Sequence, residues 1–125
     1  MIIFSVYSVK YAEPENYILH TRIKKRLESM GITYNELNGK YKGTYELALS
    51  VVDEHKEEVL LIATQYGQES ILLIDANGQG FLHYIANGVV EPIGQWTEIN
   101  GVSAPYRDSY TYDMTADKYY ICKEK

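Results

Sequence analysis

The sequence predicts an α+β fold of the ferredoxin-like kind: a βαββαβ core with one antiparallel sheet and two helices on one face, extended by C-terminal β-hairpins. Two observations lead to this prediction. Apolar residues follow strand and helix periodicities in the order strand, helix, strand, strand, helix, strand. Asn-Gly pairs then separate short alternating runs. We expect one domain over residues 1–125, with the core at about 2–76 and the hairpin extension at 77–123, because this length leaves no room for two hydrophobic cores.

The first predicted strand lies at residues 2–9, where apolar and polar side chains alternate. A helix follows it. Pro14 suits the first turn of that helix, and Gly31 suits the position just after its end. The apolar face of the helix consists of Leu19, Ile23, Leu27 and Met30. A short strand over 32–37 and a turn-rich segment over 38–43 come next.

Residues 45–52, with the sequence YELALSVV, form a strong strand pattern. Asp53 is a suitable N-cap for a second helix, and acidic residues in its first turns favour the positive end of the helix dipole. The core face of this helix consists of Val59, Ile62, Ala63 and Tyr66. Gly67 ends the helix, and residues 71–74 are expected to form a buried strand.

The sequence after residue 74 predicts hairpins. Asn-Gly is the strongest short turn signal, and it occurs at residues 77–78, 87–88 and 100–101. These pairs separate the strand-like runs GFLHYIA, VVEPIG and WTEIN. The chain finishes with two more such runs, SYTYD and KYYICK.

Composition and charge exclude several classes of protein. The chain carries 12 Lys and Arg against 17 Asp and Glu, and this balance argues against the basic surface that nonspecific nucleic-acid binding needs. No apolar run reaches the length of a membrane span, and the N-terminus lacks the basic region of a signal peptide. A lone Cys122 cannot form an internal disulfide. We therefore expect a cytoplasmic protein with neither nucleic acid nor membrane as a partner.

No motif predicts a metal or a cofactor. His20, His55 and His83 lack the spacing of metal ligands. The segment from Gly39 to Gly43 has two glycines, but it opens a strand and is not followed by Lys-Ser/Thr, so it is not a phosphate-binding loop. A Gly-x-Ser-x-Gly hydrolase motif is also missing from the sequence.

Polar residues in two segments remain as candidates. Glu46 begins the face of strand 45–52 that carries small and apolar side chains, where a carboxylate is costly unless it is paired. The alternative is a water-exposed glutamate at the end of a strand. Gln68 and Glu69 follow a helix end and precede a buried strand. Their alternative role is to cap backbone groups.

Several short motifs, in this order and spacing, resemble the phage S-adenosylmethionine lyases, long called S-adenosylmethionine hydrolases. The motifs are Asn38–Tyr41 leading to the strand headed by Glu46, then Tyr66–Leu72, Gly94–Ile99, Ala104–Pro105 and Tyr110–Asp113. The resemblance covers most of the chain. A bacterial domain family of unknown function shares the glutamate-headed strand and the Gly-Gln-acid pattern.

The resemblance implies a cofactor-independent homotrimer that binds S-adenosylmethionine between subunits. It also implies cleavage to 5'-methylthioadenosine and L-homoserine lactone, which phages use to deplete the methyl donor and escape restriction. The family's essential glutamate maps onto Glu46, its active-site tyrosine onto Tyr41, and a polar amide falls near Asn77. Gln68 and Glu69 are expected to contact substrate or to organise the subunit interface.

Two other functions remain open from the sequence. One is a non-catalytic binding module, such as a phage counter-defence decoy or a nucleotide binder. The other is a housekeeping domain of the bacterial family. The thirteen tyrosines fit either a shared ligand pocket or ordinary strand packing.

Overall fold

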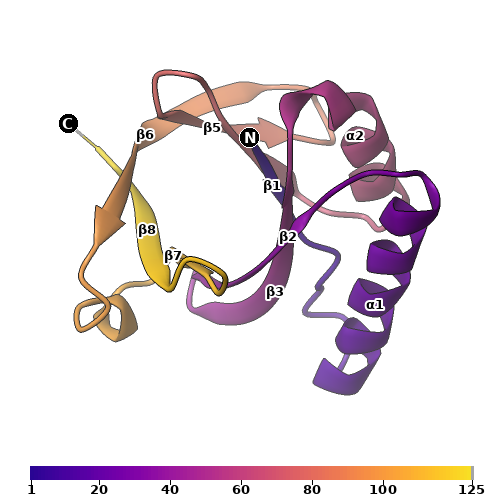
Figure 1. Ribbon diagram of the computed structural model, residues 1–125, viewed down its shortest axis with the longest axis horizontal. Helices are drawn as coiled ribbons and strands as arrows, with labels where there is room; N and C mark the ends of the chain where they lie inside the picture. The colour runs from indigo at the N-terminus through magenta and orange to yellow at the C-terminus, as the bar shows by residue number, and fades with distance from the viewer. Residues whose placement is uncertain (125) are drawn as a thin grey trace.

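A computed structural model describes residues 1–124 as a closed antiparallel barrel of eight strands with two helices outside it (Figure 1). The strands are β1 (Ile2–Phe4), β2 (Asn35–Tyr41), β3 (Thr44–Val51), β4 (Ser70–Ile74), β5 (Gln79–Tyr84), β6 (Val90–Ile99), β7 (Tyr110–Asp113) and β8 (Lys118–Lys123). The helices are α1 (Glu13–Ser29) and α2 (Lys56–Gln65), with short 3-10 turns η1 (Asp53–His55) and η2 (Ala104–Tyr106). Around the barrel the strands run β1-β3-β2-β7-β8-β6-β5-β4.

The expected ferredoxin-like architecture, an open sheet with helices packed on one face and hairpins added to it, is therefore wrong. In such a sheet β2 and β4 would be the two edges. Here β4 pairs with β5 and β2 pairs with β7, where Leu37 lies opposite Asp113 and Lys40 opposite Tyr110. The four C-terminal strands, β5 to β8, thus connect the edge strand β2 to the edge strand β4 and close the barrel. A closed barrel has no edge strand with unpaired backbone groups.

The C-terminal strands also pair differently from a simple series of hairpins. Residues 90–99 form one continuous strand, β6, instead of two separate runs. Asn100-Gly101 does not join neighbouring strands, because β6 pairs with β8 and a connection containing η2 leads on to β7. The pairs at 77–78 and 87–88 do lie between sequential, paired strands.

Local sequence signals predicted the ends of most helices and strands to within a few residues of their positions in the structure. Helix α1 ends at Ser29, and Gly31 adopts a left-handed φ of 71°, as its position after the helix predicts. Helix α2 begins at Lys56, after η1, so Asp53 does not act as its N-cap. The first strand stops at Phe4, although residues 2–7 are all buried.

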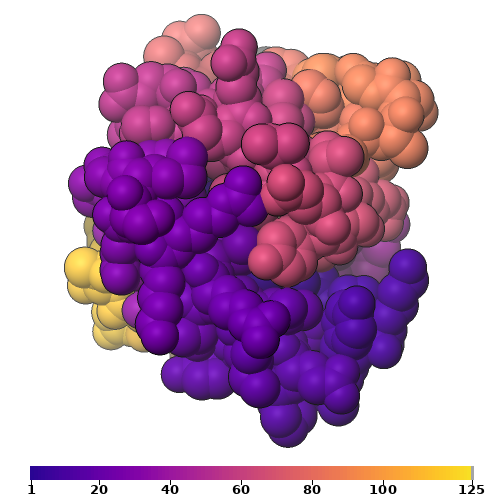
Figure 2. Space-filling model, turned by 90° about the vertical axis from the view of Figure 1, so that its right-hand side faces the viewer, coloured from indigo at the N-terminus to yellow at the C-terminus, as the bar shows by residue number. Residues whose placement is uncertain are grey.

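The two helices cover one side of the barrel and build the main hydrophobic core. Figure 2 shows this side of the molecule, with α1 and α2 next to each other on its surface. The core comprises Ile2, Phe4, Val6, Ile23, Leu27, Ile32, Leu49, Val51, Val59, Ile62, Ala63 and Ile71. Each fully buried aliphatic side chain stabilises the fold by roughly 1.5–3 kcal/mol.

The opposite faces of the same strands point into the barrel. A smaller cluster there contains Ile3, Leu37 and Ala48, with Leu72 and Trp96 packed against it. Because this cluster is small, much of the barrel interior stays unfilled, and the candidate site lies there. Across residues 1–124, the helices are all too short or too polar to cross a membrane.

Candidate active site

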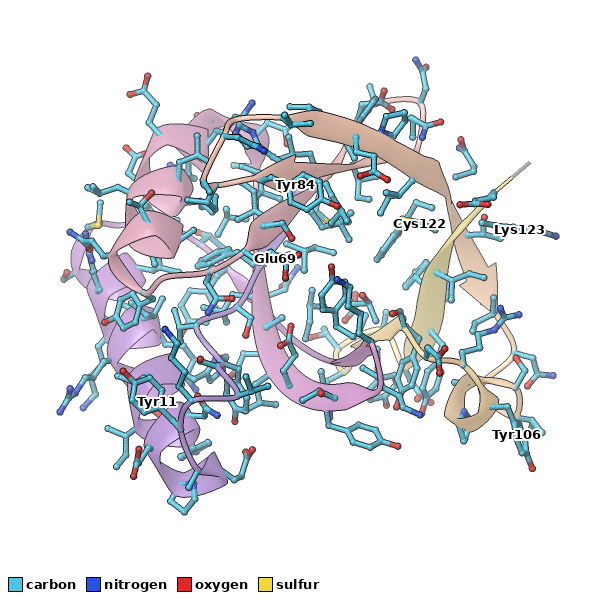
Figure 3. All side chains as sticks on the ribbon, turned by 180° about the vertical axis from the view of Figure 1, so that it is seen from behind. Tyr11, Glu69, Tyr84, Tyr106, Cys122 and Lys123 are labelled. Carbon is cyan, nitrogen blue, oxygen red and sulfur yellow. The ribbon has the colours of Figure 1, made fainter. Side chains whose placement is uncertain are left out.

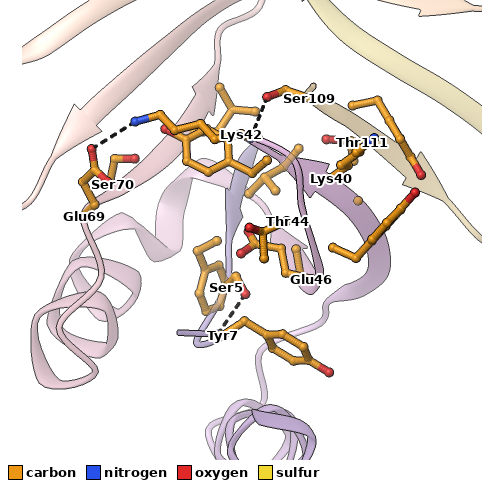
Figure 4. Close-up of a pocket in the computed structure, with 18 of the residues that line it drawn as sticks. Ser5, Tyr7, Lys40, Lys42, Thr44, Glu46, Glu69, Ser70, Ser109 and Thr111 are labelled. Atoms are coloured by element: carbon orange, nitrogen blue, oxygen red, sulfur yellow. Dashed lines mark hydrogen bonds and ion pairs between the residues drawn. The ribbon is translucent and has the colours of Figure 1, made fainter. Parts of the chain in front are cut away.

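A cavity of about 1080 Å³ occupies the barrel interior and reaches the connections at one end. Its lining includes inward-facing residues of the strands together with the β1–α1, β2–β3, α2–β4 and β6–β7 connections. The volume slightly exceeds the usual range of small-molecule sites, about 300–1000 Å³. Figure 4 shows part of its wall, with labelled residues of β2, β3, β4 and β7 and of the connections between strands and helices.

Glu46 lies in this wall on β3. Alternation along the strand places Glu46, Ala48 and Ser50 on the inner face. Among the described residues, no side chain or backbone group forms a hydrogen bond or ion pair with the Glu46 carboxylate. Burial in the cavity wall raises the pKa of Glu46 to about 7. A cation in contact with this carboxylate would stabilise its charged form.

Tyr41 lies in the cavity wall on the neighbouring strand. Its backbone pairs with Thr44, and Gly39 lies directly opposite Glu46. Tyr41 is therefore the diagonal neighbour of Glu46 on the inner face of the sheet. Lys42 and Gly43 form the turn between the strands with φ angles of 50° and 82°, as in a type I′ hairpin.

The segment after β1 forms another part of the wall, and sequence reasoning missed it. The Ser5 hydroxyl donates to the backbone oxygen of Leu47 at 2.6 Å and accepts from the Tyr7 backbone N–H at 3.0 Å. These bonds replace regular strand pairing and turn the Tyr7 ring towards the cavity. The Tyr7 hydroxyl donates to a Glu13 oxygen at 2.8 Å. Burial, Glu13 and Glu46 all raise the pKa of Tyr7, so its phenol stays neutral.

Gln68 and Glu69 both line the cavity and have protein partners. The Gln68 side-chain amide donates to the backbone oxygen of Tyr7 at 2.8 Å and so holds the β1–α1 segment in place. Glu69 is exposed and forms an ion pair with Lys42, with 3.6 Å between Oε1 and Nζ (Figure 4). The Lys42 ammonium also lies 5.4 Å from the centre of the Tyr41 ring.

The three glutamates of the cavity therefore differ. Glu13 accepts a hydrogen bond from Tyr7, and Glu69 pairs with Lys42, whereas Glu46 has no partner in residues 1–124. Four of the five side chains proposed from the sequence thus line one cavity: Tyr41, Glu46, Gln68 and Glu69.

Asn77 lies elsewhere. It is exposed in the turn between β4 and β5, and it does not line this cavity. Strand β4 runs from the cavity mouth at Ser70 to the other end of the barrel, so its following turn is remote from Glu46. The backbone oxygen of Asn77 accepts a hydrogen bond from the side-chain amide of Gln95.

Several exposed apolar and aromatic side chains surround the mouth of the cavity. They are Val9, Tyr11, Tyr45 and Tyr106, with exposed fractions of 87%, 48%, 60% and 89%. Figure 3 shows Tyr11 beside α1 and Tyr106 in the η2 segment, on opposite sides of the view. Within residues 1–124, His, Cys, Asp and Glu side chains form no group of three or more that could hold a metal ion.

Comparison with protein-family models identifies the family of this chain. The model of a family described as the S-Adenosylmethionine lyase family matches residues 2–123. No curated protein matches the chain.

Proposed function

Since the chain belongs to the S-adenosylmethionine lyase family, whose model matches residues 2–123, and is therefore a lyase that acts on S-adenosylmethionine, we propose which products it forms and how. The proposed products are 5'-methylthioadenosine and L-homoserine lactone, and Glu46 is proposed to position the substrate. The observation that carries the proposal is the unpartnered carboxylate inside a cavity large enough for such a ligand.

The proposed reaction needs only the atoms of the substrate. An oxygen of the methionine carboxylate attacks Cγ and forms the new C–O bond of the lactone ring. The Cγ–S bond breaks, and its electron pair goes to sulfur, so the sulfonium becomes a neutral thioether. The ammonium keeps its protons, and no water is consumed. Opposite charges of the substrate cancel in this step, so a site with little water favours it.

Glu46 contributes electrostatics and orientation. Deprotonated, it attracts the sulfonium or the ammonium group, and burial strengthens the interaction. Binding one cationic group at a fixed point limits the conformations of the methionyl arm and brings the carboxylate close to Cγ. No general base is required, since no proton moves.

The neighbouring residues complete the proposed site. Tyr41, the diagonal neighbour of Glu46, forms a wall and offers its hydroxyl to the substrate. Gln68 holds the Tyr7 segment, and the ion pair of Glu69 with Lys42 lies at the mouth. Asn77 can take part only from a neighbouring subunit, because its own chain places it away from the cavity.

We also propose a homotrimer in which neighbouring subunits cover the cavity mouths. The exposed apolar side chains Val9, Tyr11, Tyr45 and Tyr106 surround the mouth and would lose contact with water in such an assembly. Light scattering measures the mass directly. A strict monomer that cleaves the substrate would contradict the trimer and leave the chemistry unaffected.

The biological role proposed is that of a phage enzyme in the cytoplasm of its bacterial host. Depleting S-adenosylmethionine there removes the cofactor of modification and of some restriction enzymes. The test is to express the chain in a restricting host. Plating of unmodified phage should rise with the wild type and stay unchanged with Glu46→Gln.

Isotope labelling distinguishes lactone formation from hydrolysis. In water enriched in ¹⁸O, direct attack of water on Cγ places the label on the γ-hydroxyl of homoserine. Attack by the carboxylate first gives unlabelled lactone, and later ring opening at its carbonyl places the label in the carboxyl group. Mass spectrometry of the amino-acid product shows which position is labelled. Label at the γ-hydroxyl would refute the intramolecular mechanism.

A further inference from the structure

Two aromatic side chains lie flat against each other inside the barrel. The rings of Trp96 on β6 and Tyr120 on β8 have centroids 4.9 Å apart, and their planes differ by 9°. In the ladder between these strands, Trp96 is opposite Cys122 and Glu98 is opposite Tyr120. The two rings are therefore diagonal neighbours on the inner face, and both line the large cavity.

This aromatic pair forms the floor of the cavity. A second cavity of about 100 Å³ lies towards the other end of the barrel. Trp96 and Tyr120 line both cavities, as do Ile3 and Thr111, so these side chains separate the two spaces. Trp96 packs against the apolar cluster of Ile3, Leu37 and Ala48, as Leu72 also does.

The polar atoms of the pair are available to a ligand. Within residues 1–124, neither the indole N–H of Trp96 nor the hydroxyl of Tyr120 forms a hydrogen bond to the protein. Both side chains are only half-buried. Because these polar groups line the cavity and are not fully buried, water or a ligand inside the cavity can reach them, and a purine stacked on the rings would lie beside free hydrogen-bonding groups.

The cavity thus has two chemically different regions: the Glu46 carboxylate in one wall and an aromatic floor among aliphatic side chains. We infer that Trp96 and Tyr120 form the subsite for the purine base of the substrate. This inference rests on the proposed function, since S-adenosylmethionine joins a cationic chain to a flat purine. The exposed rim tyrosines, Tyr45 and Tyr106, cannot enclose a base in the same way.

The arrangement assigns each end of the substrate to one region. The purine stacks on the aromatic pair at the floor, and the sulfonium and the methionyl arm extend towards Glu46 and the mouth. Of the two products, 5'-methylthioadenosine keeps the stacking contact. The amino-acid product has none and leaves through the mouth.

Intrinsic fluorescence provides a direct test, because Trp96 is the chain's single tryptophan. Titrating the protein with 5'-methylthioadenosine should quench or shift its emission in a saturable way. S-methylmethionine, a sulfonium without a base, should bind without that change. If 5'-methylthioadenosine leaves the emission of the folded protein unchanged, the purine subsite is refuted.

Variants at Tyr120 give a second, independent measurement. Stacking of a base on an aromatic side chain contributes to the binding free energy, so Tyr120→Leu should weaken 5'-methylthioadenosine binding about tenfold. Tyr120→Phe keeps the ring and should restore most of the affinity. The matched control is Tyr119→Leu, which removes a ring stacked 4.5 Å from Tyr112, outside the cavity lining, and should leave the affinity unchanged.

The outcomes separate this inference from the proposed function. Wild-type affinity in a folded Tyr120→Leu protein would overturn the subsite, even if S-adenosylmethionine is still cleaved. If Tyr120→Leu does not fold by circular dichroism, calorimetry of 5'-methylthioadenosine with Trp96→Leu decides in the same way. Saturable quenching by 5'-methylthioadenosine without cleavage of S-adenosylmethionine would support the subsite and contradict the reaction.

Discussion

Glu46 lies directly across the β2–β3 ladder from Gly39, so the residue opposite the candidate carboxylate has no side chain. A Cβ atom at Gly39 would lie 2.7 Å from the backbone oxygen of Tyr110, in the strand that closes the barrel. The close approach of β2 to β7 and the open space beside Glu46 therefore depend on the same glycine.

Gly39→Ala should separate β2 from β7 and destabilise the protein by about 1–3 kcal/mol, the usual cost of forcing extra atoms into a packed region. Chemical denaturation measures the loss. The control is Gly31→Ala, where no atom lies within 4 Å and only the positive φ of 71° makes alanine costly, by about 1–2 kcal/mol. Both variants lose stability, but only Gly39→Ala should also lose turnover.

Glu46→Gln should fold normally and reduce turnover at least about a hundredfold, because misplacement of a reacting group commonly has that effect. Release of 5'-methylthioadenosine, followed by mass spectrometry, measures it. Glu69→Gln serves as the matched control: it removes an exposed carboxylate at the mouth and should cost much less. Equal losses in the two variants would contradict the role assigned to Glu46.

The pH dependence of catalysis follows from the pKa of Glu46, which burial raises to about 7 in the free protein. The deprotonated form binds the cationic substrate. kcat/KM should therefore rise with pH up to about 7 and level off above it. Binding of S-methylmethionine should follow the same curve, whereas Glu46→Gln should lack this step. A flat wild-type profile would show that Glu46 does not titrate in this range.

The contribution of Glu46 to folding stability should fall with pH over the range in which kcat/KM rises. Because the folded-state pKa of Glu46 lies above its usual value of 4.5, the folded protein binds the proton more tightly than the unfolded chain does. This contribution to stability is complete below pH 4.5 and is lost as the pH rises to about 7.

Glu46→Gln, which stays neutral, should therefore be more stable than the wild type above pH 7 by at most about 3 kcal/mol. The two proteins should have similar stability near pH 4, where the wild-type carboxyl is neutral as well. Urea unfolding at both pH values measures the difference. A wild type as stable as Glu46→Gln at high pH would mean that the carboxylate is well solvated.

Local patterns predicted local structure well. The α1 helix and the β3 strand occupy almost the expected residues, because proline, glycine and apolar periodicity act over a few positions. Closure of the barrel was not predictable in this way. It depends on the pairing of β2 with β7 and of β6 with β8, and alternation along a strand does not reveal its distant partner.

The same distinction applies to the site. Glu46 stood out because a charge interrupts the inner face of a strand, a local signal. Tyr7 and Ser5 were not singled out, since residues 2–9 were expected to form one regular strand, and the Ser5 hydroxyl interrupts it. Trp96 and Tyr120 lie on strands whose pairing was unknown, so their stacking was not predictable from the sequence.

The pairing of residues 37–40 with 110–113 also determines when a working enzyme exists during synthesis. The β2 segment leaves the ribosome long before its β7 partner has been translated, so the chain remains without a complete pocket until β7 and β8 have been made. Contacts this distant in sequence form late in folding. A chain that stops before β7 would retain both helices and most of the main core and yet have no catalytic chamber.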